Sequence, residues 1–245
     1  MSRLVWDRPG ERYFETGIQN GVLYPCTSFG VYSPGIAWNG LTGVTESPSG
    51  AEVSPLYSND IRYLNMMSGE EFEGTIEAYT YPDEFAVCDG SVFIATGVKA
   101  GQQKRQPFGL AYTTVLGNDV SGIEYGYKLH IIYGVLASPS EKAYATINDD
   151  PEAMTFSWDI STVPVDIAGI NPSASIVINS KGIIPSKLKN LEDVLYGTAS
   201  SAPRLPMPNE IVRIVSDYLM DQSYDFLMDN QGNILVDHFV QNAIY

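Results

Sequence analysis

Thiols, imidazoles and carboxylates are the side chains of this sequence that could carry catalysis or bind a metal. The cysteines are Cys26 and Cys88, and the histidines are His130 and His238. A thiol beside an imidazole can form a nucleophile and its base. Two residues of each kind in 245 are expected by chance, however, and the cysteines lack the spacing of zinc ligands. The sequence therefore predicts two free thiols, with no catalytic, metal or cofactor site.

Other chemical motifs are weak or missing. Residues Asp225 to Asn233 resemble a calcium-binding loop only loosely, because the acids before Gly232 are out of phase. Neither a phosphate-binding glycine loop nor a Gly-x-Ser-x-Gly elbow occurs. A carboxylate pair for glycoside hydrolysis could come from the acids between Glu70 and Glu77, but such pairs need burial that this polar run does not suggest. We expect a protein that is not an enzyme.

The placement of charge is more informative than any motif. The net charge is −15, so a surface that grips nucleic-acid phosphates is not expected. Two long segments contain acids and no basic residue. The first, between Arg62 and Lys99, holds Glu70, Glu71, Glu73, Glu77, Asp83, Glu84 and Asp89. The second, between Lys142 and Lys181, holds Asp149, Asp150, Glu152, Asp159 and Asp166. At least two strands should therefore have polar faces that carry only acids.

The elements that hold these acids are predicted to be strands. Apolar and polar residues alternate from Met154 to Ser161 and from Phe72 to Tyr79, which is typical of a sheet with one buried face and one wet face. The same period recurs over Tyr127–Tyr133. Tyrosine, glycine and proline are abundant, at 16, 22 and 15 residues, as in β-proteins with many turns. The expected fold is mainly β: an antiparallel β-sandwich or flattened barrel.

Three segments depart from the strand pattern. Residues 185–197 place Leu188, Leu191, Val194 and Leu195 on one stripe and predict a flanking α-helix. Gly43 to Asp60 has few large apolar residues and should be a long exposed loop that forms an arm. The expected β domain covers residues 1–205. Residues 206–245 form a C-terminal extension of uncertain structure, in which Ile211 to Leu219 fits an amphipathic helix or an extended segment.

Nothing in the sequence predicts a membrane anchor or an export signal. The first ten residues lack the apolar stretch of a signal peptide. The longest apolar run, Ile131 to Ala137, is far shorter than the roughly 20 residues that a spanning helix needs. We expect a soluble protein made in the cytosol.

Several literal runs resemble the major tail proteins of long-tailed bacteriophages with non-contractile tails. The resemblance covers roughly residues 1–212 in order. The runs are Gly35 to Glu52, Glu70 to Phe85, Gly117 to Asp119, Gly126 to His130, Tyr144 to Asp149, Phe156 to Trp158, Leu188 to Gly197 and Arg204 to Pro206.

This resemblance implies a structural virion protein. In that family, subunits close into hexameric rings, and the rings stack into a tail tube through which DNA passes without specific binding. The partners implied are other copies of the chain, a tape-measure protein, and tail terminator and distal tail proteins. A competing interpretation is a monomeric β-sandwich that recognises carbohydrate or a host surface.

Two groups of candidate functional residues follow. The acids Glu73, Glu77 and Asp159 are candidates for the lining of the tube, where repulsion would keep DNA from sticking. The candidate inter-ring arm comprises Thr45, Glu46, Ser47, Pro48, Ser49, Gly50, Ala51 and Glu52.

Overall fold

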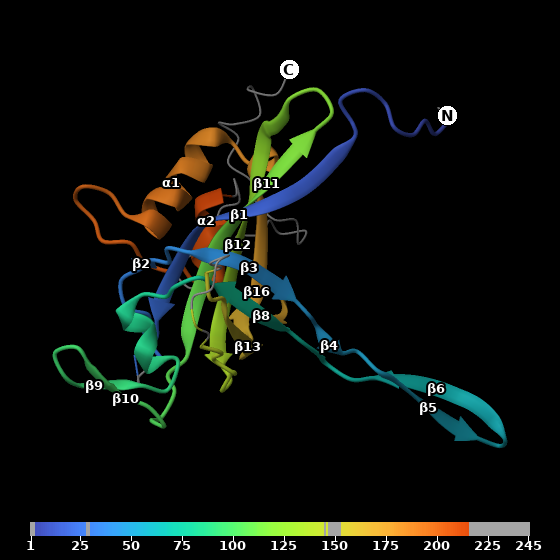
Figure 1. Ribbon diagram of the computed structural model, residues 1–245. Coiled ribbons are helices and arrows are strands. Elements are labelled where there is room, and N and C mark those ends of the chain that lie inside the picture. The colour runs from blue at the N-terminus through green and yellow to red at the C-terminus, as the bar shows by residue number, and fades with distance from the viewer. Residues whose placement is uncertain (1–2, 28–29, 145, 147–152, 216–245) are drawn as a thin grey trace, which may run out of the picture.

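The computed structural model describes residues 3–27, 30–144, 146 and 153–215 and is mainly β, with antiparallel pairing throughout and two α-helices (Figure 1). Eight strands form the main sheet in the order β2-β1-β11-β12-β13-β8-β3, and β16 also pairs with β12. Their bounds are β1 (Tyr13–Pro25), β2 (Ile36–Ala37), β3 (Leu41–Glu46), β8 (Glu73–Ala78), β11 (Phe108–Asn118), β12 (Gly122–Ala137), β13 (Phe156–Thr162) and β16 (Ser175–Asn179). The predicted fold class is confirmed.

Strand β12 divides the sheet into two layers. Its residues 128–132 pair with β16, whereas residues 135–137 pair with β13, which leads on to β8 and β3. Between these stretches lies Gly134, at φ +58°, where an added Cβ would stand 2.4 Å from the Val163 carbonyl oxygen. Only glycine fits this bend. Trp38, directly after β2, donates its backbone N–H to the Gly21 carbonyl in β1, and β3 begins only three residues later, so the two end strands of the order lie close together. The result is a flattened barrel.

The space between the two layers is filled by aromatic rings. Trp158 is fully buried and lies 5.1 Å from Phe85 and 5.3 Å from Tyr81, measured between ring centroids. Its indole N–H donates to the buried Asp89 carboxylate, which Lys142 also binds. The predicted inward face of β13, with Phe156, Trp158 and Ile160, is confirmed; the strand begins at Phe156, and Met154 before it is exposed.

Two helices cover the outer face of the layer formed by β1, β11, β12 and β16. Helix α1 (Pro185–Tyr196) buries Leu188, Leu191 and Leu195, as predicted, and ends at Gly197, which has φ +79°. Helix α2 (Pro208–Val215) buries Ile211. Residues 206–215 therefore pack on the β domain. The rest of the proposed extension, with His238 and the loop from Asp225, lies outside the described residues.

Tyrosine hydroxyls tie the helix layer to the sheet. Tyr24 in β1 donates to the carbonyl of Leu195, and Tyr133 in β12 donates to the carbonyl of Pro206. Both rings are buried, so each hydrogen bond satisfies a polar group that would otherwise be costly. No helix in the described part of the chain has the length and apolar character needed to span a bilayer.

The remaining elements are short. They are the 3₁₀ helices η1 (Asp83–Val87) and η2 (Ser180–Gly182), the hairpin of β9 (Val92–Ala95) with β10 (Val98–Ala100), and the hairpin of β14 (Val165–Ile167) with β15 (Ile170–Ser173). Three of the acids predicted in the second acid-only segment, Asp149, Asp150 and Glu152, lie outside the described residues.

A two-stranded arm leaves the body between β3 and β8 (Figure 1). It comprises β4 (Ser49–Gly50), β5 (Val53–Ser58), β6 (Ile61–Met67) and β7 (Glu70–Glu71); β5 pairs with β6 and β4 with β7. The segment 43–60 was expected to be an irregular loop. Residues 43–46 instead belong to β3 of the main sheet, with Gly43 and Val44 half-buried, so the predicted bounds began too early. The rest of the segment is largely exposed, as expected, but its backbone is paired, because the chain reverses at Asn59 and Asp60, both with positive φ. The arm is therefore a hairpin that reaches to Glu71.

Candidate functional site

The three candidate lining acids lie on one face of the second layer. Strands β8 and β13 pair so that Thr75 is opposite Asp159, Glu77 opposite Ser157, and Glu73 opposite Ser161. Residues directly opposite each other in an antiparallel pair point to the same side. Thr75 donates a hydrogen bond to Asp159 at 3.0 Å. The structure therefore brings Glu73, Glu77 and Asp159 together, as strand alternation predicts.

No helix in the described part of the chain lies over this acidic face. Helices α1 and α2 pack on the other layer, so the side of β3, β8 and β13 turned away from the aromatic core faces solvent (Figure 1). Glu77 and Asp159 are exposed and Glu73 is half-buried. The outward positions paired across β8 and β13 hold three acids, one threonine and two serines, and no basic residue. The face is a negative surface without a built-in counter-charge.

The arm carries a second unusual surface. Its large apolar side chains are exposed on both strands; Tyr57, Tyr63 and Met67 are 66%, 70% and 70% accessible. The full set is Val53, Leu56, Tyr57, Ile61, Tyr63, Leu64, Met66 and Met67. A lone two-stranded ribbon is marginally stable in water, and exposed apolar patches of this kind mark sites of association. Of the candidate arm residues, Ser49 to Glu52 lie in this ribbon, whereas Ser47 and Pro48 lead into it.

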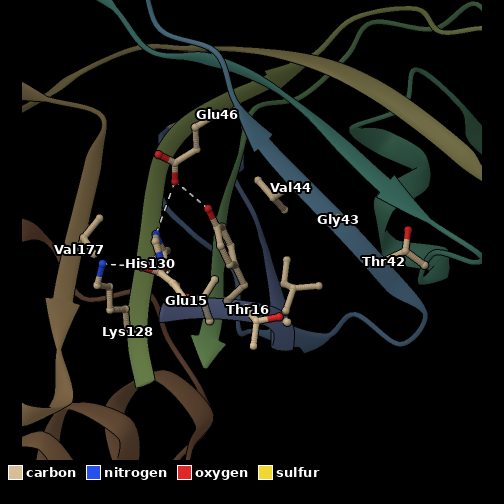
Figure 2. Close-up of a pocket in the computed structure, with 13 residues that line it drawn as sticks. Glu15, Thr16, Thr42, Gly43, Val44, Glu46, Lys128, His130 and Val177 are labelled. Atoms are coloured by element: carbon tan, nitrogen blue, oxygen red, sulfur yellow. Dashed lines mark hydrogen bonds and ion pairs between the residues drawn. The ribbon is translucent and has the colours of Figure 1, made fainter. Parts of the chain in front are cut away.

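Glu46, the last residue of β3, points into the body instead of along the arm. Thr45 faces outward opposite Thr75, and Glu46 is opposite Gly74, which has no side chain to fill the inner side. The Glu46 carboxylate accepts a hydrogen bond from Tyr112 at 2.8 Å and lies 3.4 Å from Nδ1 of His130 (Figure 2). The root of the arm is thus fastened to β11 and β12.

Glu46 borders a cavity of about 630 Å³ between β3 and the strands β1, β11, β12 and β16 (Figure 2). Its polar lining includes Glu15, Thr42, Thr114 and Lys128, as well as Tyr112 and His130. The rings of Tyr112 and His130 stack with centroids 4.7 Å apart. The cavity is therefore polar although Tyr112 belongs to the aromatic core.

The hydrogen bonds fix the tautomer of His130. Thr114 donates its one hydroxyl proton to Glu15 at 2.5 Å, so its oxygen can only accept from Nε2 of His130 at 3.0 Å. Neutral His130 therefore carries its proton on Nε2 and leaves Nδ1 bare. That Nδ1 is buried, has no hydrogen-bond partner, and faces a carboxylate oxygen of Glu46. Two acceptors meet there without a donor between them.

The carboxyls of the cavity are held in their charged form. The imidazole of His130, 3.4 Å away, lowers the pKa of Glu46, and the Tyr112 hydroxyl adds to this effect against the opposing effect of burial. Burial raises the pKa of Glu15, but hydrogen bonds from Lys128 and Thr114 outweigh it, and the pKa is lowered overall. Both groups are anions at neutral pH and suit the binding of hydrogen-bond donors.

The thiols have no comparable setting. Burial raises the pKa of Cys88 to about 12 and also raises that of Cys26, which suppresses the reactive thiolate. Among the described residues, no group of three or more potential ligands could hold a metal ion.

Sequence reasoning did not find the cavity. Its polar residues come from four strands, and Glu46 and His130 are far apart in the chain. The nearest signal was the alternation over Tyr127–Tyr133, which puts Lys128 and His130 on the face opposite the helix-covered tyrosines. That pattern does not reveal which residue of β3 meets His130. Neither a scan against protein-family models nor a search of the curated proteins gives a match to this chain.

Proposed function

We propose that this protein is the tail-tube subunit of a long-tailed bacteriophage, a structural protein that assembles with copies of itself into stacked, six-fold rings. The observation that carries the proposal is the arm, a paired ribbon standing clear of the body with large apolar side chains exposed along it. In an isolated molecule those side chains cost free energy in water, so the arm suits a surface on a neighbouring subunit.

The resemblance of the sequence to phage tail proteins supports another copy of the chain as that neighbour. Ring closure fits the physics of the fold, because β3 and β16 are sheet edges with one paired neighbour each, and a head-to-tail contact can cover such edges. The arm would then connect one ring to the next.

The acidic face suits the wall of a channel for DNA. Glu73, Glu77 and Asp159 share a face without a basic residue, and six-fold repetition would turn three acids per subunit into a dense negative band. Such a band repels phosphates and lets a polyanion slide. DNA would pass through without binding specifically.

Negative-stain electron microscopy of the purified protein tests the proposal. We expect tubes or stacked rings of uniform diameter. Discrete monomeric particles at all concentrations would contradict the proposal and favour the binding module that recognises carbohydrate or a host surface. Glycan binding by those particles would then be the next measurement.

A further inference from the structure

The cavity beside the root of the arm holds buried polar atoms that have no hydrogen-bond partner among the described residues. Nδ1 of His130 and Oγ1 of Thr42 line it and are buried without partners. The Glu46 carboxylate uses only Oε1, and its Oε2 accepts no hydrogen bond from the residues that the structure describes. Unpaired buried polar atoms are costly and uncommon in native proteins, so the cavity is built to receive something.

The occupant that fits is a cation with several N–H groups. Glu15 and Glu46 provide two carboxylates, against the single ammonium of Lys128. His130 is 8% exposed, and its Nδ1, which faces Oε1 of Glu46 at 3.4 Å, has no hydrogen-bond partner among the described residues (Figure 2). A guanidinium presents several donors in one plane and pairs well with carboxylates.

One basic residue in the chain is placed to act as that cation. Arg62 is the only lysine or arginine between Arg12 and Lys99, and it lies at the far end of the arm, opposite Tyr57. It forms no ion pair or hydrogen bond with any residue that the structure describes. Around it are the exposed side chains of Tyr57, Ile61 and Tyr63, which could cover the rim of a cavity that a guanidinium enters.

Arg62 cannot serve the cavity of its own molecule, because the arm runs away from the body (Figure 1). From Ser47 to Asn59 the extended chain spans roughly 40 Å, at about 3.3 Å per residue. We propose that Arg62 of one copy enters the cavity of a second copy and pairs there with Glu46 and His130. This inference rests on the proposed function, since it names the place where the inter-ring arm lands.

Such a contact would make the assembly directional. The tip of one arm would bind at the root of the next, so each subunit offers one tip and one cavity, and the contact is repeated from ring to ring. Binding of Arg62 to Glu46 would also hold the root of the receiving arm, because Glu46 is the residue that fastens that root to Tyr112.

Charge-neutralising variants of the full chain test the contact. Arg62→Gln removes the cation, and Glu46→Gln removes its acceptor. Lys104→Gln is the control for Arg62→Gln, since it removes one positive charge at an exposed position on the body. The concentration needed for tube formation, followed by light scattering, should rise about tenfold or more in either single variant, since tenfold corresponds to a loss of about 1.4 kcal/mol per contact. It should not rise in the control, and Arg62→Lys should recover part of the loss.

The double variant Arg62→Gln/Glu46→Gln decides whether the two residues meet. If they do, the double variant assembles no worse than either single variant. Additive losses, or Arg62→Gln assembling at the wild-type concentration, would overturn the inference and leave tube formation intact. A wild-type protein that forms no tubes at any concentration would overturn the proposed function as well.

Discussion

Trp158 is the residue on which the packing of the two layers most depends. It is fully buried, lies edge-on to Phe85 and Tyr81, and donates its indole N–H to Asp89. Asp89 also binds Lys142, so the ring connects the aromatic core to a buried ion pair. Loss of the ring would leave both a void and an incompletely paired carboxylate.

We expect Trp158→Ala to lower the free energy of unfolding by about 3–5 kcal/mol, the usual cost of truncating a large buried aromatic. Chemical denaturation of the purified variant gives this value, or the variant accumulates as insoluble protein. Trp6→Ala is the control, because Trp6 is 73% exposed and should change stability little. Equal stabilities of the two variants would mean that Trp158 does not lie in the core.

Glu46 and Glu15 determine how the cavity responds to acid. Their pKa values are lowered from the ordinary value of 4.5, so the folded state favours their charged forms more than the unfolded state does. Their contribution to stability is present above about pH 4.5 and is lost as the pH falls through the folded-state pKa. Lower pH therefore protonates the carboxyls and weakens the bonds to Tyr112 and Lys128.

Thermal unfolding at a series of pH values checks this sign. The midpoint temperature of unfolding should decrease as the pH is lowered from 5 to 3 in the wild-type protein. It should decrease less steeply in Glu46→Gln. Glu52→Gln, on the exposed arm, should keep the wild-type slope. A Glu46→Gln profile parallel to that of the wild type would show that the carboxyl does not contribute.

At the scale of elements, the arm stands outside the folded core. Ser47 N–H still donates to the Glu73 carbonyl at its base, so β3 and β8 are paired up to the point where the arm leaves. The ribbon beyond this point exposes its side chains and adds little to the core. Folding should tolerate its removal.

We expect replacement of Ser49–Glu71 with Asn-Gly, which forms a tight two-residue hairpin turn, to leave a folded subunit that no longer forms tubes. Circular dichroism and thermal unfolding should match the wild type, and electron microscopy should show single particles. Tubes of normal length from this variant would refute the role of the arm.

The sequence predicted some of these elements and not others, for identifiable reasons. Strands β8 and β13 alternate because one face of each meets the core, and α1 has a leucine stripe because one face meets the sheet. Strand β6 has no buried face, so its residues show no period to detect. The cavity depends on long-range register, such as the pairing of Glu46 with Gly74, and local patterns do not encode that.

At the scale of the whole molecule, one sheet layer is covered by helices and the other presents bare acids. The acids of one subunit are weak alone, since charges in salt water are screened over about 8 Å. A narrow protein-walled channel focuses the field, and repetition around a ring brings many such acids together. The acidic face matters for function only if it is enclosed.

Reversal of these charges in assembled phage tests whether the acidic face lines an enclosed channel. We expect Glu73→Lys/Glu77→Lys to leave tails intact and to slow or block DNA release, with recovery at higher salt. Glu11→Lys/Glu124→Lys is the control, at exposed positions outside this face. Normal DNA ejection at low and high salt would indicate that Glu73 and Glu77 do not face the path of the DNA.

Electron cryomicroscopy of the assembled protein, with reconstruction of its symmetry, tests the central claim most directly. The proposal predicts six-fold rings stacked around an open channel, with Glu73, Glu77 and Asp159 on the channel wall and the arm in contact with the next ring. A protein that stays monomeric, or an assembly with β3, β8 and β13 turned to the outside, would contradict it.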